Sequence, residues 1–153
     1  MALDNVTAAI GRGLIAGFCG TAAMTLSQQI EMNLTGREPS TGPGDMVASA
    51  LGLEPKGQRE RESFSQLVHW TWGTLWGLPR GLLSLSGANG GKATLMHAFI
   101  VLGGDFWILH KFGKRPPPWQ WDRNELAVEV LHKSVLALAT GLVYDTLEHN
   151  SHM

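Results

Sequence analysis

The sequence is poor in cysteine and has no excess of positive charge, and each absence excludes a class of protein. Its single cysteine, Cys19, excludes an intramolecular disulfide and any metal site built from several cysteines. The net charge of −1 leaves no basic stripe to neutralise phosphates, so nucleic acid is not an expected partner. Charged residues make up only 16% of the 153 residues. They are bunched, which leaves uncharged stretches at residues 14–26 and 136–143.

Common catalytic motifs are also missing. The chain has no Walker loop, no dinucleotide-binding glycine fingerprint, no Gly-x-Ser-x-Gly elbow and no His-Glu-x-x-His pair. The glycine-rich run at residues 87–92 lacks the spacing of a phosphate loop and predicts a turn. We therefore expect a protein without enzymatic activity.

Glycine, in contrast, is abundant, with 19 residues. In a water-soluble helix each interior glycine costs roughly 1 kcal/mol relative to alanine. In a membrane helix, small residues spaced by four allow another helix to approach closely. Two stretches show this spacing, and their predicted helix-packing residues are Gly13 and Gly17 in the first and Gly73, Gly77 and Gly81 in the second.

Four segments have the length and composition of membrane spans: residues 6–32, 62–85, 93–111 and 124–147. The sequence therefore predicts an all-α, four-helix transmembrane bundle with a long loop between helices 1 and 2, in a single domain over residues 1–153. Both termini then lie on one face of the membrane.

Local signals refine these segments. Pro79 predicts a kink or an end in the second span, and the pair Gly103-Gly104 predicts a bend in the third. In the long loop, Asp45 is expected to cap a short helix that ends near Leu53. Asp122, three residues before Glu125, predicts the start of the fourth span.

Lys and Arg are concentrated in the loops after the first and third segments. By the positive-inside rule these long loops are cytoplasmic and both termini lie outside. Six tryptophans suit a chain anchored at membrane interfaces, and membrane lipid is the expected partner. We expect Lys133 to extend along its helix to the lipid headgroups.

Ionisable residues buried in a membrane usually face a partner or a wet cavity. One predicted group, the loop-face cluster, lies near the long loops. Within it, Glu129 and His132 have the Glu-x-x-His spacing of di-metal bundles, which makes them candidate metal ligands. A mononuclear metal or a haem held by two histidines is an alternative to simple packing histidines, and no cofactor is predicted. The cluster comprises His69, Asp105, His110, Glu129 and His132.

The second group, the terminal-face cluster, lies near the two termini and comprises Arg12, Arg80, His97 and Asp145. We expect Arg12 or Arg80 to pair with Asp145, with His97 nearby. A fold-fixing ion pair is the simplest interpretation, and a proton or anion entry site is the alternative.

Three stretches carry a family resemblance: residues 13–25, residues 69–81, and the run 116–121 followed by the helix at 126–145 with His132. Together they resemble small uncharacterised bacterial inner-membrane proteins, distantly the YagU-like group. The resemblance implies a multi-pass protein of the bacterial cytoplasmic membrane, tied to acid or envelope stress. It supplies no catalytic residues.

Two functions remain open. The glycine stripes predict a non-enzymatic accessory or interaction component that contacts other membrane subunits or a second copy of itself. The alternative is a haem-, metal- or quinone-binding redox anchor, or a proton-linked transporter using Asp105, Glu129 and His132. A soluble helical domain is a third interpretation, but it leaves the glycine content unexplained.

Overall fold

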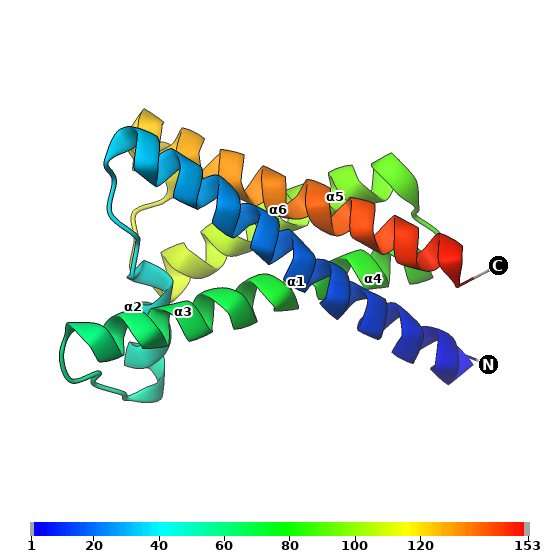
Figure 1. Cartoon of the computed structure of the whole chain (residues 1–153), viewed down its shortest axis with the longest axis horizontal. Helices are drawn as coiled ribbons and strands as arrows, with labels where there is room; N and C mark the ends of the chain where they lie inside the picture. Colours follow the sequence, from blue (N-terminus) through cyan, green and yellow to red (C-terminus); the bar gives the residue numbers. More distant parts are fainter. Residues whose placement is uncertain (1, 152–153) are drawn as a thin grey trace.

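The computed structural model describes residues 2–151. Over this range the chain forms six α-helices and one short 3-10 helix (Figure 1). Their bounds are α1 (Ala2–Thr35), α2 (Gly42–Leu51), α3 (Gln58–Leu75), α4 (Gly77–Leu85), α5 (Gly90–Lys111), η1 (Pro118–Gln120) and α6 (Arg123–Asn150).

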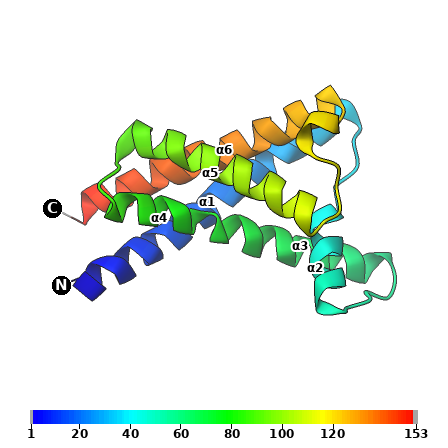
Figure 2. The same cartoon turned by 180° about the vertical axis from the view of Figure 1, so that it is seen from behind.

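The helices run along one long axis. Helices α1 and α6 pack against each other and diverge toward the termini, α3 and α4 pack on α1, and α5 packs on α6 (Figures 1 and 2). Both ends of the chain lie at one end of this bundle, while α2 and the start of α3 lie at the other. We call these the terminal end and the loop end.

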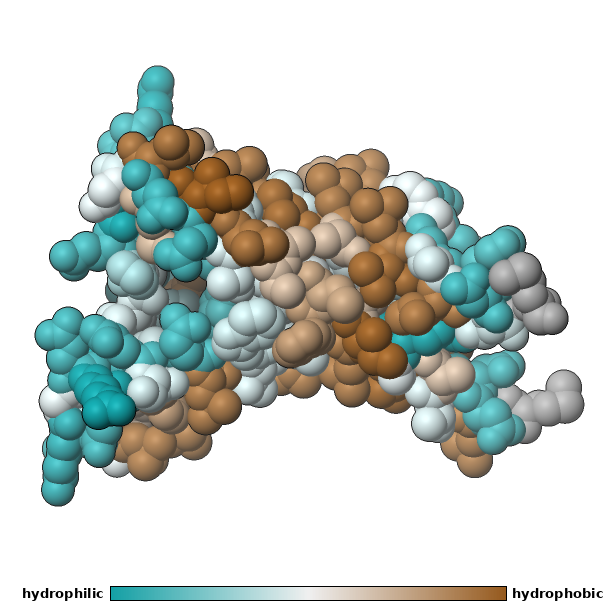
Figure 3. Space-filling view, in the orientation of Figure 1, coloured by the Kyte–Doolittle hydropathy of each residue, from teal (hydrophilic) through white to brown (hydrophobic). Residues whose placement is uncertain are grey.

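An apolar belt separates the two ends. Figure 3 shows hydrophobic side chains across the middle of the molecule and hydrophilic ones at both ends. Many exposed side chains of α1, α5 and α6 are large and apolar, including Ile15, Phe18, Phe99, Leu138 and Leu142. Three helices, α1, α5 and α6, are long and apolar enough to cross a membrane. The predictions of an all-helical chain and of membrane-type helices are therefore confirmed over residues 2–151.

The second predicted span is divided in two. Helix α3 ends at Leu75 and α4 begins at Gly77, so the break falls at Trp76 and not at Pro79 itself. Pro79 has no N–H to donate to the carbonyl of Leu75, so the loss of helical bonding appears one turn earlier. Pro79 itself lies in the first turn of α4, where proline is tolerated.

The two glycine stripes pack against each other within one chain. A Cβ added at Gly77 would lie 2.8 Å from the Cα of Gly17, and one added at Gly13 would lie 2.7 Å from the carbonyl oxygen of Gly77. Gly81 faces Ala9, and Gly73 faces Thr21. The helices therefore run antiparallel in backbone contact, and the stripes that suggested a second subunit are covered inside the chain.

The third span does not open at the glycine pair, because α5 is unbroken from Gly90 to Lys111. Gly104 instead makes room for an aromatic ring: a Cβ there would lie 3.2 Å from Cζ3 of Trp76. A Cβ on Gly103 would meet nothing within 4 Å. Gly104 alone thus accommodates the indole at the α3–α4 break.

Two helix starts were predicted from aspartates, with different outcomes. Asp122 caps α6 as predicted, since its Oδ1 accepts from the backbone N–H of Asn124 at 2.9 Å. Asp45 does not cap α2, which begins three residues earlier at Gly42. Its carboxylate instead binds Arg61 of α3 through both oxygens, at 2.7 and 2.6 Å.

This ion pair predicts a local pH dependence. The Arg61 guanidinium lowers the pKa of Asp45 below its ordinary value of 3.8. The pair therefore stabilises the folded state fully above the pKa that Asp45 has in the unfolded chain. This stabilisation is lost as the pH falls through the lowered pKa of Asp45 in the folded protein. We expect the protection of the α2 amides against hydrogen exchange, relative to an unstructured chain at the same pH, to fall below about pH 4. In Asp45→Asn this protection should already be lower than the parent's at pH 6 and should lack the acid transition.

Candidate functional site

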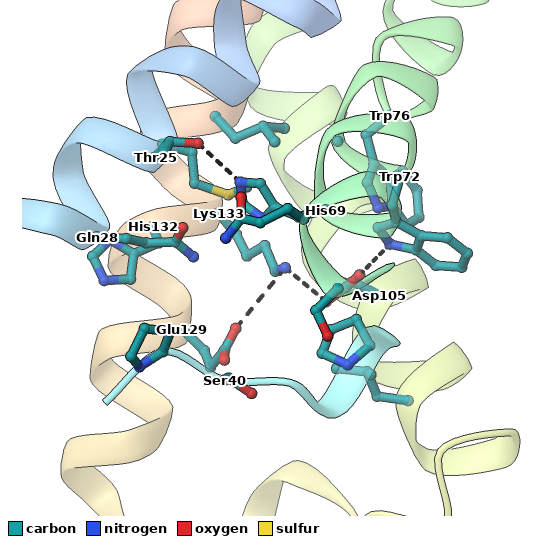
Figure 4. A pocket seen from close by; sticks show the side chains of 18 of the residues that line it. Thr25, Gln28, Ser40, His69, Trp72, Trp76, Asp105, Glu129, His132 and Lys133 are labelled. Atoms are coloured by element: carbon teal, nitrogen blue, oxygen red, sulfur yellow. Dashed lines mark hydrogen bonds and ion pairs between the residues drawn. The ribbon is translucent and has the colours of Figure 1, made fainter. Parts of the chain in front are cut away.

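A polar pocket of about 180 Å³ lies inside the loop end of the bundle (Figure 4). Side chains from α1, α3, α5 and α6 line it. Arg37, Pro39 and Ser40 of the first loop, Pro43 of α2, and Arg115 after α5 also line it. Four of the five residues predicted as the loop-face cluster line it: His69, Asp105, Glu129 and His132.

The centre of the pocket is an ion pair. Lys133 Nζ lies 2.9 Å from Asp105 Oδ2 and 3.9 Å from Glu129 Oε2. The Lys133 side chain is 13% exposed and that of Asp105 is 3% exposed, so both charges are largely removed from solvent. Trp72 donates from Nε1 to Asp105 Oδ1 at 2.8 Å. Asp105 is therefore held by two helices at once, α3 and α6.

The position of Lys133 corrects a prediction. We expected its side chain to reach the headgroups, but Figure 4 shows its ammonium group between the two carboxylates. The carboxylates of Asp105 and Glu129 stabilise the Lys133 ammonium group inside the pocket. In apolar surroundings the side chain would instead extend toward water. The spacing of four residues between Glu129 and Lys133 was the signal in the sequence, because it puts both on one helix face.

The two histidines of the pocket bind to α1. The Thr25 hydroxyl donates to the carbonyl of Thr21 at 2.7 Å, so His69 donates from Nε2 to Thr25 Oγ1 at 2.8 Å. His132 Nδ1 lies 2.9 Å from Ser27 Oγ, and its Nε2 lies 3.6 Å from Glu31 Oε2. These hydroxyl partners were not predicted, because the register between α1 and its neighbours was not known.

His110 lies outside the cluster to which it was assigned. It is exposed at the end of α5 and donates from Nδ1 to the carbonyl of Arg115 at 2.8 Å. Asp105 and Leu109, four residues apart, take the buried face of α5. One further residue turns by about 100°, which directs His110 away from the pocket.

The candidate metal ligands do not converge. Within residues 2–151 no three His, Cys, Asp or Glu side chains come together as a metal site. The ammonium group of Lys133 lies where a cation shared by Asp105 and Glu129 would be held. His132 is directed to Ser27 and Glu31 on α1.

The terminal-face cluster contains the ion pair that was predicted for it. Arg80, which is fully buried, donates from Nη2 to Asp145 Oδ1, and its guanidinium lies 4.4 Å from the centroid of the Tyr144 ring. Arg12 lies 5.8 Å from the same ring and 4.0 Å from Glu148 Oε1.

His97 lies on the buried face of α5 between this cluster and the pocket. It donates from Nε2 to the carbonyl of Trp76 at 2.7 Å, at the α3–α4 break. Met24, Val101 and Leu136, with Trp76 packed against them, form an apolar layer between the two polar groups. The predicted separation into two polar layers is therefore present in the fold.

Searches of protein-family models, curated proteins and solved structures give no match to this chain. The pocket is therefore interpreted from its own geometry.

Proposed function

We propose that the chain crosses a bacterial cytoplasmic membrane four times, with α3 and α4 together as the second span. The support is their register with α1, in which Gly81 faces Ala9, Gly77 faces Gly13, and Gly73 faces Thr21. Residues 73–81 therefore occupy the same depth as the belt residues of α1. The Lys and Arg residues of the long loops favour a cytoplasmic loop end.

We propose that the protein is a proton-linked transporter and that the loop-end pocket is its exchange site. A single observation carries this proposal: a desolvated Lys133–Asp105 pair lines a cavity, with a second carboxylate, Glu129, 3.9 Å from the lysine. A buried pair that serves only the fold is normally enclosed by packing. Here the charges face a space that a solute or water can enter.

The geometry gives a route from protonation to movement. Asp105 belongs to α5, while Lys133 and Glu129 both belong to α6. A proton added to the Asp105 carboxylate removes its negative charge, and the ammonium group then has Glu129 as its remaining charged partner. The polar link between α5 and α6 is thereby weakened. Loss of the proton restores the link, so the two helices have a proton-dependent contact.

The accessory-component interpretation rested on the glycine stripes. Because these stripes are covered within the chain, they no longer require a second subunit. The pocket therefore supports transport over the accessory role.

The Asp105→Asn variant tests the transport function. Purified protein is reconstituted into vesicles that contain a pH-sensitive dye, and proton uptake is followed after an imposed pH step. We expect uptake by the parent protein and a fall to the rate of protein-free vesicles in Asp105→Asn, because the amide cannot take up the proton.

The matched control is Asp45→Asn, which removes the carboxylate of the exposed Asp45–Arg61 pair outside the pocket. Its uptake should equal that of the parent. Equal uptake by Asp105→Asn and the parent protein, or no uptake above protein-free vesicles by the parent, contradicts the proposed function.

A further inference from the structure

We infer that α2 is an interfacial helix, and that its apolar flank lies against the hydrocarbon of the lipid leaflet at the loop end. This inference rests on the membrane arrangement in the proposed function. It assigns a lipid contact to a part of the chain outside the four spans, and it does not depend on proton exchange in the pocket.

The orientation of α2 is the first argument. Helix α2 runs across the long axis of the bundle, whereas α3, on which it packs, runs along that axis (Figures 1 and 2). It lies where the apolar belt gives way to the hydrophilic loop end (Figure 3). In a bundle that crosses a membrane along its long axis, a helix in this position lies in the plane of the interface.

One face of α2 is fixed on α3. Its buried residues are Gly44 and Ala48, which are four residues apart and so share a face. A Cβ added at Gly44 would lie 2.8 Å from the Cα of Ser65, which places the two helix backbones in close contact at this point. The close contact leaves a flank of α2 on either side.

The two flanks differ in polarity. Asp45 and Ser49 lie on one flank, and Val47 and Leu51 lie on the other, because each pair is separated by four residues. Leu51 is 65% exposed, although its flank is apolar. The helix therefore has a polar and an apolar flank, as helices at membrane interfaces do.

The contacts with α3 show which way each flank faces. Asp45 binds Arg61, whereas Gly44 meets Ser65, one turn farther along α3. Four residues of helix span roughly 6 Å, so the polar flank lies on the side of the outer end of α3. The apolar flank then faces the belt. Figure 3 agrees, since hydrophobic side chains gather beside the belt in the region of α2 and hydrophilic ones cover the outer tip.

The apolar surface continues past the end of the helix. Gly52 has a left-handed conformation, with a φ of 66°, and the backbone N–H of Leu53 donates to the carbonyl of Ala48 at 2.8 Å. The Leu53 side chain is 47% exposed. Together with Pro55 and Phe64 it lines a shallow groove. Apolar side chains of α2, of the loop after it and of α3 thus form one exposed surface.

Charge argues for hydrocarbon and not for anionic headgroups as the occupant. Residues 42–64 contain three cationic side chains and four carboxylates, so the region is not a basic patch of the kind that anionic lipids attract. The apolar flank is instead turned toward the belt, whose exposed side chains include Phe18 and Leu138. The same lipid that surrounds the belt would cover α2 at its edge.

Spin-label accessibility in phosphatidylcholine vesicles tests this contact on the full chain. Cys19→Ala removes the native thiol, and Leu51→Cys then provides the single site for a nitroxide. Molecular oxygen collects in lipid and a neutral nickel chelate stays in water, so the ratio of their collision rates reports the surroundings of the nitroxide. We expect a ratio near that of Leu138→Cys, an exposed position of α6 in the belt.

Ser49→Cys is the matched control, because position 49 is also exposed but lies on the polar flank of the same helix. Its ratio should be shifted toward the nickel chelate. Addition of phosphatidylglycerol should leave both ratios unchanged. Equal ratios at positions 49 and 51 overturn the inference, and so does a dependence of the position-51 ratio on phosphatidylglycerol. Slow collisions with both reagents at position 51 also overturn it, since they indicate a protein partner or a second copy on this flank.

Position 138 separates this inference from the proposed function. A nitroxide that is in water at both 138 and 51 contradicts the membrane arrangement, and with it the proposed function and the interfacial helix. A nitroxide in lipid at 138 and in water at 51 removes only the interfacial helix. The four spans and the Asp105-dependent proton uptake then stand.

Discussion

Asp145→Asn destabilises the protein by about 3 kcal/mol, because it leaves a buried guanidinium group without its counter-ion. The Arg80 side chain is 0% exposed, whereas that of Asp145 is 35% exposed. Removal of one partner from a buried pair typically costs about 3–5 kcal/mol, and the partial exposure of Asp145 places this variant at the lower end. The other two guanidinium nitrogens of Arg80, Nε and Nη1, have no hydrogen-bond partner within residues 2–151. They therefore cannot compensate for the loss of Asp145. Equilibrium unfolding in mixed micelles measures the loss.

The exposed Arg115–Glu125 pair supplies the control. Its side chains are 31% and 44% exposed, and Glu125→Gln should cost less than about 1 kcal/mol. The double variant Arg80→Met with Asp145→Asn should recover most of the loss, because no buried charge is left. A cost for Asp145→Asn no greater than that for Glu125→Gln would show that Arg80 is hydrated in solution.

The two polar groups therefore differ in kind. Arg80 is fixed by Asp145, by the Tyr144 ring and by its position on the buried face of α4. Lys133, in contrast, has two carboxylates at unequal distances and a cavity beside it. Under the proposed function, the Arg80–Asp145 pair anchors the terminal end, and Lys133 with its two carboxylates is the group that responds to protons.

The sequence was informative about depth along the helices. Length and apolar runs predicted the helices, and the distance of each ionisable residue from a helix end assigned it to one of two layers. Arg80 and Asp145 could be paired in this way because both lie near the terminal end. Spacing of four also identified the facing glycines, although not which stripe each one would meet.

Rotation about the helix axes was not predictable from such spacing. His132 and Lys133 differ by about 100° around α6, yet both line the pocket because it lies between their two directions. The prediction that His110 belongs to the loop-face cluster was wrong for the same reason, since it rested only on the depth of His110 along its helix. Thr25 meets His69 through the register of α1 with α3, which the packed glycine stripes set. Ser27 meets His132 through the register of α1 with α6, where Gly20 faces Leu136 and Thr140.

That register is tested most directly by Gly17→Ala, which should cost about 2 kcal/mol of unfolding free energy. The added Cβ would lie 2.9 Å from both the backbone nitrogen and the Cα of Gly77. Backbone atoms cannot move aside as a flexible side chain can, so α1 and α4 must separate. Equilibrium unfolding in mixed micelles measures the change, and proton uptake should fall with it because α1 forms one wall of the pocket.

Gly11→Ala is the matched control on the same helix, where an added Cβ would meet nothing within 4 Å. It should stabilise the protein by up to about 1 kcal/mol, because alanine is the better helix former. The same glycine-to-alanine change should therefore lower the free energy of unfolding at position 17 and raise it at position 11. If Gly17→Ala left the unfolding of the single chain unchanged and altered only its association, the stripe would face another subunit. The α1–α4 contact, and the second span that it supports, would then be wrong.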